Sequence, residues 1–185
     1  MIGGLKTILP RCSMKGKIII LNGPSSSGKS TLSRNLQKIW PAPLYYLSYD
    51  LVEEEMAPYP HSHHAYEGFP SPVKEFLDVM YTSAAAIANA GRDVVIDNCL
   101  FDTEDIIDLC RERLTGLEQI WVRVKLDQDE LDRREKARGN RAIGKARWQA
   151  EHITPKEDNA YAVIVDTANP SADCAKAIYN AVFGE

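Results

Sequence analysis

The stretch that decides the fold of this chain is IIILNGPSSSGKS, residues 18–30. It begins with four consecutive apolar residues, which is typical of a buried strand, and continues into a turn rich in glycine and serine. Residues 23–30 match the pattern G-x-x-x-x-G-K-[ST] without a mismatch, and this pattern joins a strand directly to a helix. We therefore expect a strand over 18–21, a phosphate-binding loop over 23–30 and a helix over 29–40.

The chemistry of this loop predicts a nucleotide triphosphate. Its glycines let successive N–H groups converge on phosphate oxygens, and the following helix adds its positive end. Lys29 is expected between the β- and γ-phosphates of ATP, and Ser30 Oγ on Mg²⁺. The alternative, a plain glycine-serine turn, leaves Lys29 and Ser30 unexplained. The other predicted nucleotide contacts are Gly23, Pro24, Ser25, Ser26, Ser27, Gly28 and Thr31.

Strands and helices alternate along the rest of the chain. Further strands are predicted at 45–49, 94–96, 120–126 and 163–165, and helices at 73–90, 102–114, 128–138 and 171–183. Each strand is an apolar run rather than an alternating pattern, which indicates a parallel sheet covered on both faces. We predict an α/β protein of the P-loop NTPase fold, with a five-stranded parallel sheet. One domain is expected over 17–185, after an N-terminal extension over 1–16.

Acidic residues follow the predicted strands, where ligands bind in such sheets. Asp97 comes after 94–96, as the Walker B acid does, and is predicted to hold Mg²⁺ directly or through water. Its alternative role is an ordinary helix N-cap. Asp127 is interpreted as a structural cap paired with Glu130. Asp166 and Thr167 follow the fifth strand and are expected near the adenine base.

Asp50 follows the second strand and is the best candidate for the general base. An acceptor hydroxyl must lose a proton as it attacks the γ-phosphate, and a carboxylate within reach can accept it. The alternative is an N-cap for a helix over 51–56.

Residues 133–147 hold seven cationic side chains. We interpret about 134–147 as an arginine-rich lid that closes over ATP, with Gly139 and Gly144 breaking the helix. Arg134, Arg138 and Arg141 lie on one helical face if the helix continues, and are predicted to act on the γ-phosphate. The alternatives are a solvated helix face or an RNA-binding patch. The chain as a whole carries 22 basic and 26 acidic residues, a net charge of −4, which disfavours a nucleic-acid partner.

Residues 51–75 are expected on the acceptor side, in a proline-rich excursion. His61, His63 and His64 lie there without the usual spacing of metal ligands, so a polar pocket wall is favoured over a metal site. Tyr59 and Tyr66 would suit an aromatic or amphipathic acceptor.

Composition indicates a cytoplasmic protein with no membrane partner. The four cysteines are scattered without a C-x-x-C pair, as expected for reduced thiols, and no apolar stretch reaches 18 residues. The oligomeric state stays open.

Taken together, residues 19–30, Asp50, Val95-Ile96-Asp97 and the motif Arg134-Glu135-x-x-Arg138-Gly139-x-Arg141 resemble the chloramphenicol phosphotransferase-like family of P-loop kinases, over about 17–183. The resemblance implies transfer of the ATP γ-phosphate to a small-molecule hydroxyl. It matches the family's general base to Asp50 and its lid arginines to Arg138 and Arg141. The enzyme that gives the family its name phosphorylates chloramphenicol at its primary hydroxyl, which protects the antibiotic's producer. This chain departs from that enzyme mainly at 57–72.

Three other functions compete. A nucleotide or nucleoside kinase usually carries an arginine shortly after the Walker B acid, and this chain has none in residues 98–101, after Asp97. A nucleotide-sugar kinase of the zeta-toxin type also fits the core residues. A GTP-driven switch would need Asn-Lys-x-Asp, which does not occur. A non-catalytic ATP binder would not need Lys29, Ser30, Asp50 and Asp97 together.

Overall fold

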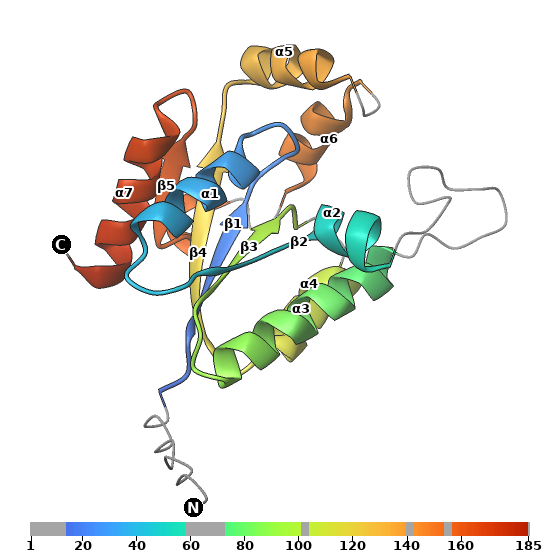
Figure 1. Ribbon diagram of the computed structural model, residues 1–185. Helices are drawn as coiled ribbons and strands as arrows, with labels where there is room; N and C mark the ends of the chain where they lie inside the picture. The colour runs from blue at the N-terminus through green and yellow to red at the C-terminus, as the bar shows by residue number, and fades with distance from the viewer. Residues whose placement is uncertain (1–13, 58–72, 101–103, 140–142, 154–156, 185) are drawn as a thin grey trace, which may run out of the picture.

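The computed structural model describes residues 14–57, 73–100, 104–139, 143–153 and 157–184 (Figure 1). The strand that precedes the phosphate loop, β1 (Lys17–Asn22), lies in the centre of the sheet. The other strands are β2 (Tyr45–Ser48), β3 (Val94–Asn98), β4 (Glu118–Lys125) and β5 (Val163–Asp166). The order is β2-β3-β1-β4-β5, and every pair is parallel. The predicted five-stranded parallel sheet is therefore confirmed.

Helices cover both faces of the sheet, and alternate residues of β1 show why. Ile18 and Ile20 pack into one apolar cluster with α3 (Val73–Asn89) and α4 (Glu104–Arg113). Ile19 and Leu21 pack into the opposite cluster with α1 (Lys29–Ile39) and α7 (Ser171–Phe183). Figure 1 shows α1 beside α7, and α3 with α4 on the other side. An apolar run with both faces buried is what the sequence of β1 predicts.

The parallel register brings the strand ends to one edge. Leu21 of β1 pairs with Asp97 of β3, and Asp97 pairs with Ser48 of β2. The end of β4 reaches the same edge, where Lys125 pairs with Asp166. The phosphate loop and the predicted acids are thus gathered by the sheet itself.

The strands end one or two residues from their predicted positions, and at β3 and β2 the difference bears on the predicted acids. β3 continues to Asn98, so Asp97 lies within its last residues rather than after it. β2 ends at Ser48, and Asp50 lies in the short helix α2 (Tyr49–Leu51), which continues as a π-helical turn, η1 (Val52–Met56). The cause is Ser48, whose Oγ accepts a hydrogen bond from Leu51 N at 3.0 Å. Ser48 is therefore the N-cap here, and the alternative role of Asp50 as that cap is wrong.

Two helices lie beyond the strand ends on the side of the phosphate loop, α5 (Gln128–Arg138) and α6 (Lys145–His152) (Figure 1). Gly139 ends α5 with φ 66° and Gly144 precedes α6 with φ 93°, so the predicted helix breaks are confirmed. Because α5 stops at Arg138, no single helical face extends to residue 141. Arg141 lies outside the described residues, as do His61, His63, His64, Tyr59, Tyr66 and residues 1–13.

The remaining element is a short 3₁₀ turn, η2 (Asp158–Ala160). In the part of the chain that the structure describes, no helix is long and apolar enough to cross a membrane. Cys110 and Cys174 are buried cysteines that form no disulfide among the described residues.

Candidate active site

The phosphate loop and β3 bring three predicted residues together. Lys29 is the first residue of α1 and is 8% exposed. Its Nζ donates to Pro24 O at 2.8 Å and lies 3.6 Å from Asp97 Oδ1. Ser30 Oγ donates to Asp97 Oδ2 at 2.6 Å. The lysine, the hydroxyl and the acid that the sequence assigned to the phosphates and the metal therefore form one cluster.

The backbone of the loop turns through two residues in the left-handed region. Gly28 has φ 88°, and Ser26 has φ 63°, a conformation that residues with a side chain rarely adopt. Among the described residues, the hydroxyls of Ser26 and Ser27 are buried without a hydrogen-bond partner. These hydroxyls and the N–H groups that begin α1 are the donors that phosphate oxygens accept from. The loop residues present thus fit the triphosphate of ATP.

The pair Ser30 and Asp97 supplies hydroxyl and carboxylate oxygens, the ligand types that Mg²⁺ prefers. No group of three acidic, histidine or cysteine side chains suited to a metal occurs in the described ranges. One protein carboxylate, completed by substrate phosphates and water, is the usual way in which Mg²⁺ is held with a nucleotide. The donor set therefore fits magnesium that arrives with ATP.

Tyr46 of β2 also contacts the acid and was missed by sequence reasoning. Its hydroxyl donates to Asp97 Oδ2 at 3.4 Å. Burial raises the pKa of Tyr46 above its usual 10.0, and the charge of Asp97 raises it further. Tyr46 is thus a neutral donor at physiological pH, and it steadies the carboxylate without competing for a cation.

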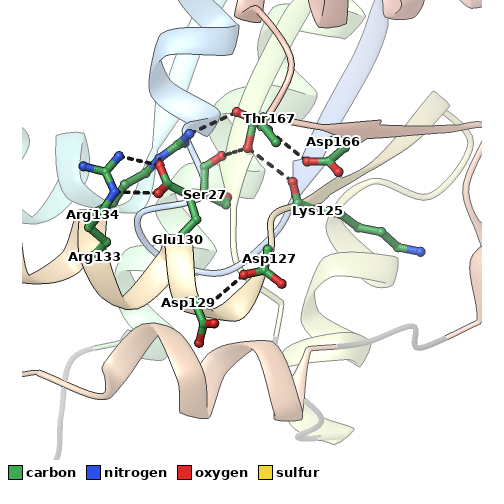
Figure 2. Close-up of polar contacts among 10 residues, drawn as sticks. Ser27, Lys125, Asp127, Asp129, Glu130, Arg133, Arg134, Asp166 and Thr167 are labelled. Carbon is green, nitrogen blue, oxygen red and sulfur yellow. Dashed lines mark hydrogen bonds and ion pairs between the residues drawn. The ribbon is translucent and has the colours of Figure 1, made fainter.

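Thr167, at the end of β5, supports the phosphate loop (Figure 2). Its Oγ1 donates to Ser27 O at 2.6 Å, with a second contact to Lys125 O at 3.2 Å. The exposed neighbour Asp166 accepts a hydrogen bond from Ala168 N at 2.9 Å. Both residues lie at the predicted edge, while their contact with adenine stays a prediction.

Arg134 of α5 lies against the phosphate loop. Its NH2 group donates to Thr167 O at 3.1 Å, and NH1 is 3.5 Å from the position that a Cβ on Gly28 would take. Its Nε donates to Glu130 Oε1 at 2.8 Å, and Arg133 donates to both oxygens of Glu130 (Figure 2). Hydrogen bonds from Arg133, and then from Arg134, lower the pKa of Glu130 to about 2.

The expected capping pair at the start of α5 forms only in part. Asp127 Oδ1 accepts a hydrogen bond from Asp129 N at 2.9 Å, as predicted for an N-cap (Figure 2). Glu130 turns to the two arginines instead of pairing back toward the cap. Both partners are charged in the bonds to the arginines, whereas a backbone N–H carries no charge, which accounts for the difference.

Arg138 and Asp50 meet although 88 positions separate them in the sequence. Arg138 NH2 lies 3.8 Å from Asp50 Oδ2, with side chains 43% and 37% exposed. An ion pair so exposed adds little stability. The contact is informative because of its position. It places Arg138, an arginine of the predicted lid, beside the candidate base Asp50, at the edge that also holds Asp97.

Three buried polar residues near the loop were missed. Asn22 donates to Tyr161 OH at 3.0 Å and accepts from Leu100 N at 2.9 Å, which fixes the exit of β1. Glu135 accepts from Gly144 N and Ala146 N, and Gln149 accepts from Ser25 N. Gly144 has no side chain that could cap α6, so the sequence indicates that a residue from elsewhere must supply the cap. Nothing in the sequence singled out Gln149.

Several solved structures that share this fold are kinases. APS kinase CysC of Mycobacterium tuberculosis, in complex with AMPPNP and APS, superposes with a TM-score of 0.69 at 18% identity, covering 91% of this chain and 98% of that chain. Shikimate kinase of Acinetobacter baumannii, in complex with shikimate, gives 0.68 at 17% identity, with 92% and 95% covered. A gluconokinase of Sinorhizobium meliloti gives 0.63 at 19% identity, with 93% and 94% covered.

Sequence comparison adds the family. No protein of curated function matches the chain significantly. The family model described as chloramphenicol phosphotransferase-like protein matches residues 16–183, nearly the whole chain. With this match and the kinase fold, the chain is a P-loop phosphotransferase that uses ATP. It belongs to the chloramphenicol phosphotransferase-like family.

Proposed function

We propose that this kinase transfers the γ-phosphate of Mg·ATP to a hydroxyl of a small molecule, with Asp50 as the general base. In this step the acceptor oxygen forms a bond to the γ-phosphorus while the bond to the β–γ bridging oxygen breaks. ADP leaves, and the hydroxyl proton passes to Asp50. A carboxylate in this position typically contributes ~10²–10⁴ in rate.

The contact between Asp50 and Arg138 is the observation that carries the proposal. It joins α2, which directly follows β2, to the end of α5 at a distance of 3.8 Å, on the edge where Ser30 meets Asp97. A base and a cation side by side suit a hydroxyl that loses its proton next to a phosphoryl group that gains negative charge. A passive ATP-binding switch has no need of this pair.

The donor side of the reaction is assigned from the contacts of the loop. Lys29 is assigned to the β- and γ-phosphates, and Ser30 with Asp97 to Mg²⁺. Bound magnesium would neutralise charge on the phosphates. Arg138 and Arg134, with Arg141, are assigned to the transition-state charge; Arg134 already lies against Gly28.

Chloramphenicol 3-O-phosphorylation is the first candidate reaction, because the family description names a chloramphenicol phosphotransferase. A nucleotide acceptor is the second candidate. It is favoured by the similarity to APS kinase, whose solved complex holds APS beside a nucleotide analogue. The two candidates differ in the acceptor alone and share every donor-side residue.

The test is a screen for acceptor-dependent ADP release. The panel holds chloramphenicol, other hydroxylated antibiotics, nucleosides, sugars, nucleotide sugars and APS, each with Mg·ATP. A true acceptor yields a phosphorylated product by mass spectrometry and ³¹P NMR. Chloramphenicol with its primary hydroxyl acetylated is the matched control and must give none. ADP release that no hydroxylated compound stimulates would overturn the proposal.

A further inference from the structure

Gln149 connects helix α6 to the phosphate loop. Its Oε1 accepts a hydrogen bond from Ser25 N at 2.6 Å, and its side chain is buried, with the residue 5% exposed. The two residues are 124 positions apart in the sequence. Ser25 is part of the motif loop, so this contact attaches a helix beside the lid to the phosphate-binding backbone itself.

Glu135 fixes the orientation of α6 from the neighbouring helix α5. Its carboxylate accepts from Gly144 N at 2.6 Å and from Ala146 N at 2.8 Å, and the residue is 3% exposed. Gly144 has no side chain to cap α6, so Glu135 takes that role across the intervening loop. A buried carboxylate is costly unless charge-assisted hydrogen bonds satisfy it, and loss of this cap should free α6 from α5.

The two contacts act in series between the lid and the loop. Glu135 sets where α6 lies, α6 presents Gln149, and Gln149 holds Ser25. We propose that Gln149 is a positioning residue that keeps α6 closed on the phosphate loop during transfer, with Glu135 of α5 acting through it. The inference rests on the proposed phosphoryl transfer and deepens it.

The chemistry of the side chain supports this role. The acceptor atom faces a loop built for phosphates, where a carboxylate would repel the nucleotide. An amide oxygen can accept the Ser25 N–H without adding negative charge. Closure matters because water admitted to the γ-phosphate competes with the acceptor hydroxyl. We therefore expect the contact between Gln149 and Ser25 to determine how much ATP is used to phosphorylate the acceptor and how much is lost to hydrolysis.

The decisive variant is Gln149→Met, which keeps the length of the side chain but removes the acceptor. We expect kcat for transfer to fall about tenfold, as for loss of one buried hydrogen bond, while the KM for ATP changes little. The yield of phosphorylated acceptor per ADP released should also fall. Amide exchange at Ser25 and in residues 145–152 should become faster, with exchange in α7 unchanged.

Glu151→Gln is the matched control on the same helix. Glu151 is exposed, lies outside the predicted lid and has no hydrogen bond to the loop among the described residues, so its loss should leave coupling and Ser25 exchange unchanged. Glu135→Gln should also lower the yield of phosphorylated acceptor per ADP released. Adding Gln149→Met to Glu135→Gln should lower this yield less than Gln149→Met does in the unmodified protein, because the contacts act in series.

Unchanged Ser25 exchange in Gln149→Met would overturn the inference, as would lower stability with an unchanged product yield per ADP. Additive effects of Glu135→Gln and Gln149→Met would overturn the serial arrangement. If no acceptor is phosphorylated by the unmodified protein, the proposed function fails by itself. Amide exchange at Ser25, together with the rate of ATP hydrolysis, would still decide whether Gln149 holds α6 on the phosphate loop.

Discussion

The floor of the site and its predicted lid are built in different ways. The floor, meaning the phosphate loop and Asp97, is carried by the central strands β1 and β3, whose apolar residues are fully buried, and the sheet register sets its geometry. The lid side is held by ion pairs such as Arg138 with Asp50 and Arg147 with Asp132, all partly exposed, and by the buried contacts of Glu135 and Gln149. Buried apolar packing is therefore concentrated where phosphates are predicted to bind, and exposed ion pairs lie where the acceptor is predicted to enter.

The largest effect should come from Lys29→Ala in the floor. Because Lys29 is assigned to the phosphates rather than to the core, we expect turnover to fall on the order of 10³-fold or more with thermal stability nearly unchanged. Calorimetry should show loss of magnesium-dependent ATP binding. If the variant binds ATP as the unmodified protein does, the loop is only a turn.

Asp50→Asn tests the acceptor side and should rank second. The change keeps the size of the side chain and removes its basicity, so transfer should fall by ~10²–10⁴ while ATP affinity holds. Ser48, not Asp50, caps α2, so stability should not change. Acceptor-dependent product formation is the measurement. Near-normal transfer with a confirmed acceptor would remove Asp50 from the mechanism.

Arg138→Ala probes the lid directly. We expect kcat to fall about 10²-fold, less than the ~10³–10⁵ that a single arginine finger contributes, because Arg134 remains at the loop. Affinity for ATP should change less than kcat, since the charge acts mainly in the transition state. Arg138→Lys is the control and should rescue poorly, because it loses the planar fork. Full activity in the alanine variant would favour a solvated helix face.

The difference between the floor and the predicted lid also explains how much of each could be predicted from the sequence. Lys29, Ser30 and Asp97 follow from local spacing, because a strand, a turn and a helix in succession fix where those side chains lie. The end of β2 was predicted one residue too late. The hydroxyl of Ser48 caps a helix there, before the apolar pattern ends. Periodicity does not report such local side-chain bonds to the backbone.

Contacts of the lid side were harder to predict for a physical reason. Glu130 had two possible partners, a capping N–H and two arginines, and the folded geometry chose the arginines. The bond between Gln149 and Ser25 exists only because α6 folds back over the loop, and a single glutamine carries no pattern. Long-range polar contacts depend on tertiary placement, which local spacing does not encode.

Asp127 gives the smallest expected effect and separates stability from chemistry on the lid side. It begins α5 as an N-cap, with Oδ1 accepting from Asp129 N at 2.9 Å, and touches no predicted site residue in the contacts described. Asp127→Ala should therefore lower the free energy of unfolding by about 1 kcal/mol, as followed by denaturant titration. Asp127→Asn should restore it, because Asn caps a helix about as well as Asp. Transfer measured on the folded protein should change less than twofold in both variants, because the floor is independent of this cap. A loss of transfer comparable to that of Asp50→Asn, with stability intact, would instead place Asp127 in the chemistry and remove the division between floor and lid.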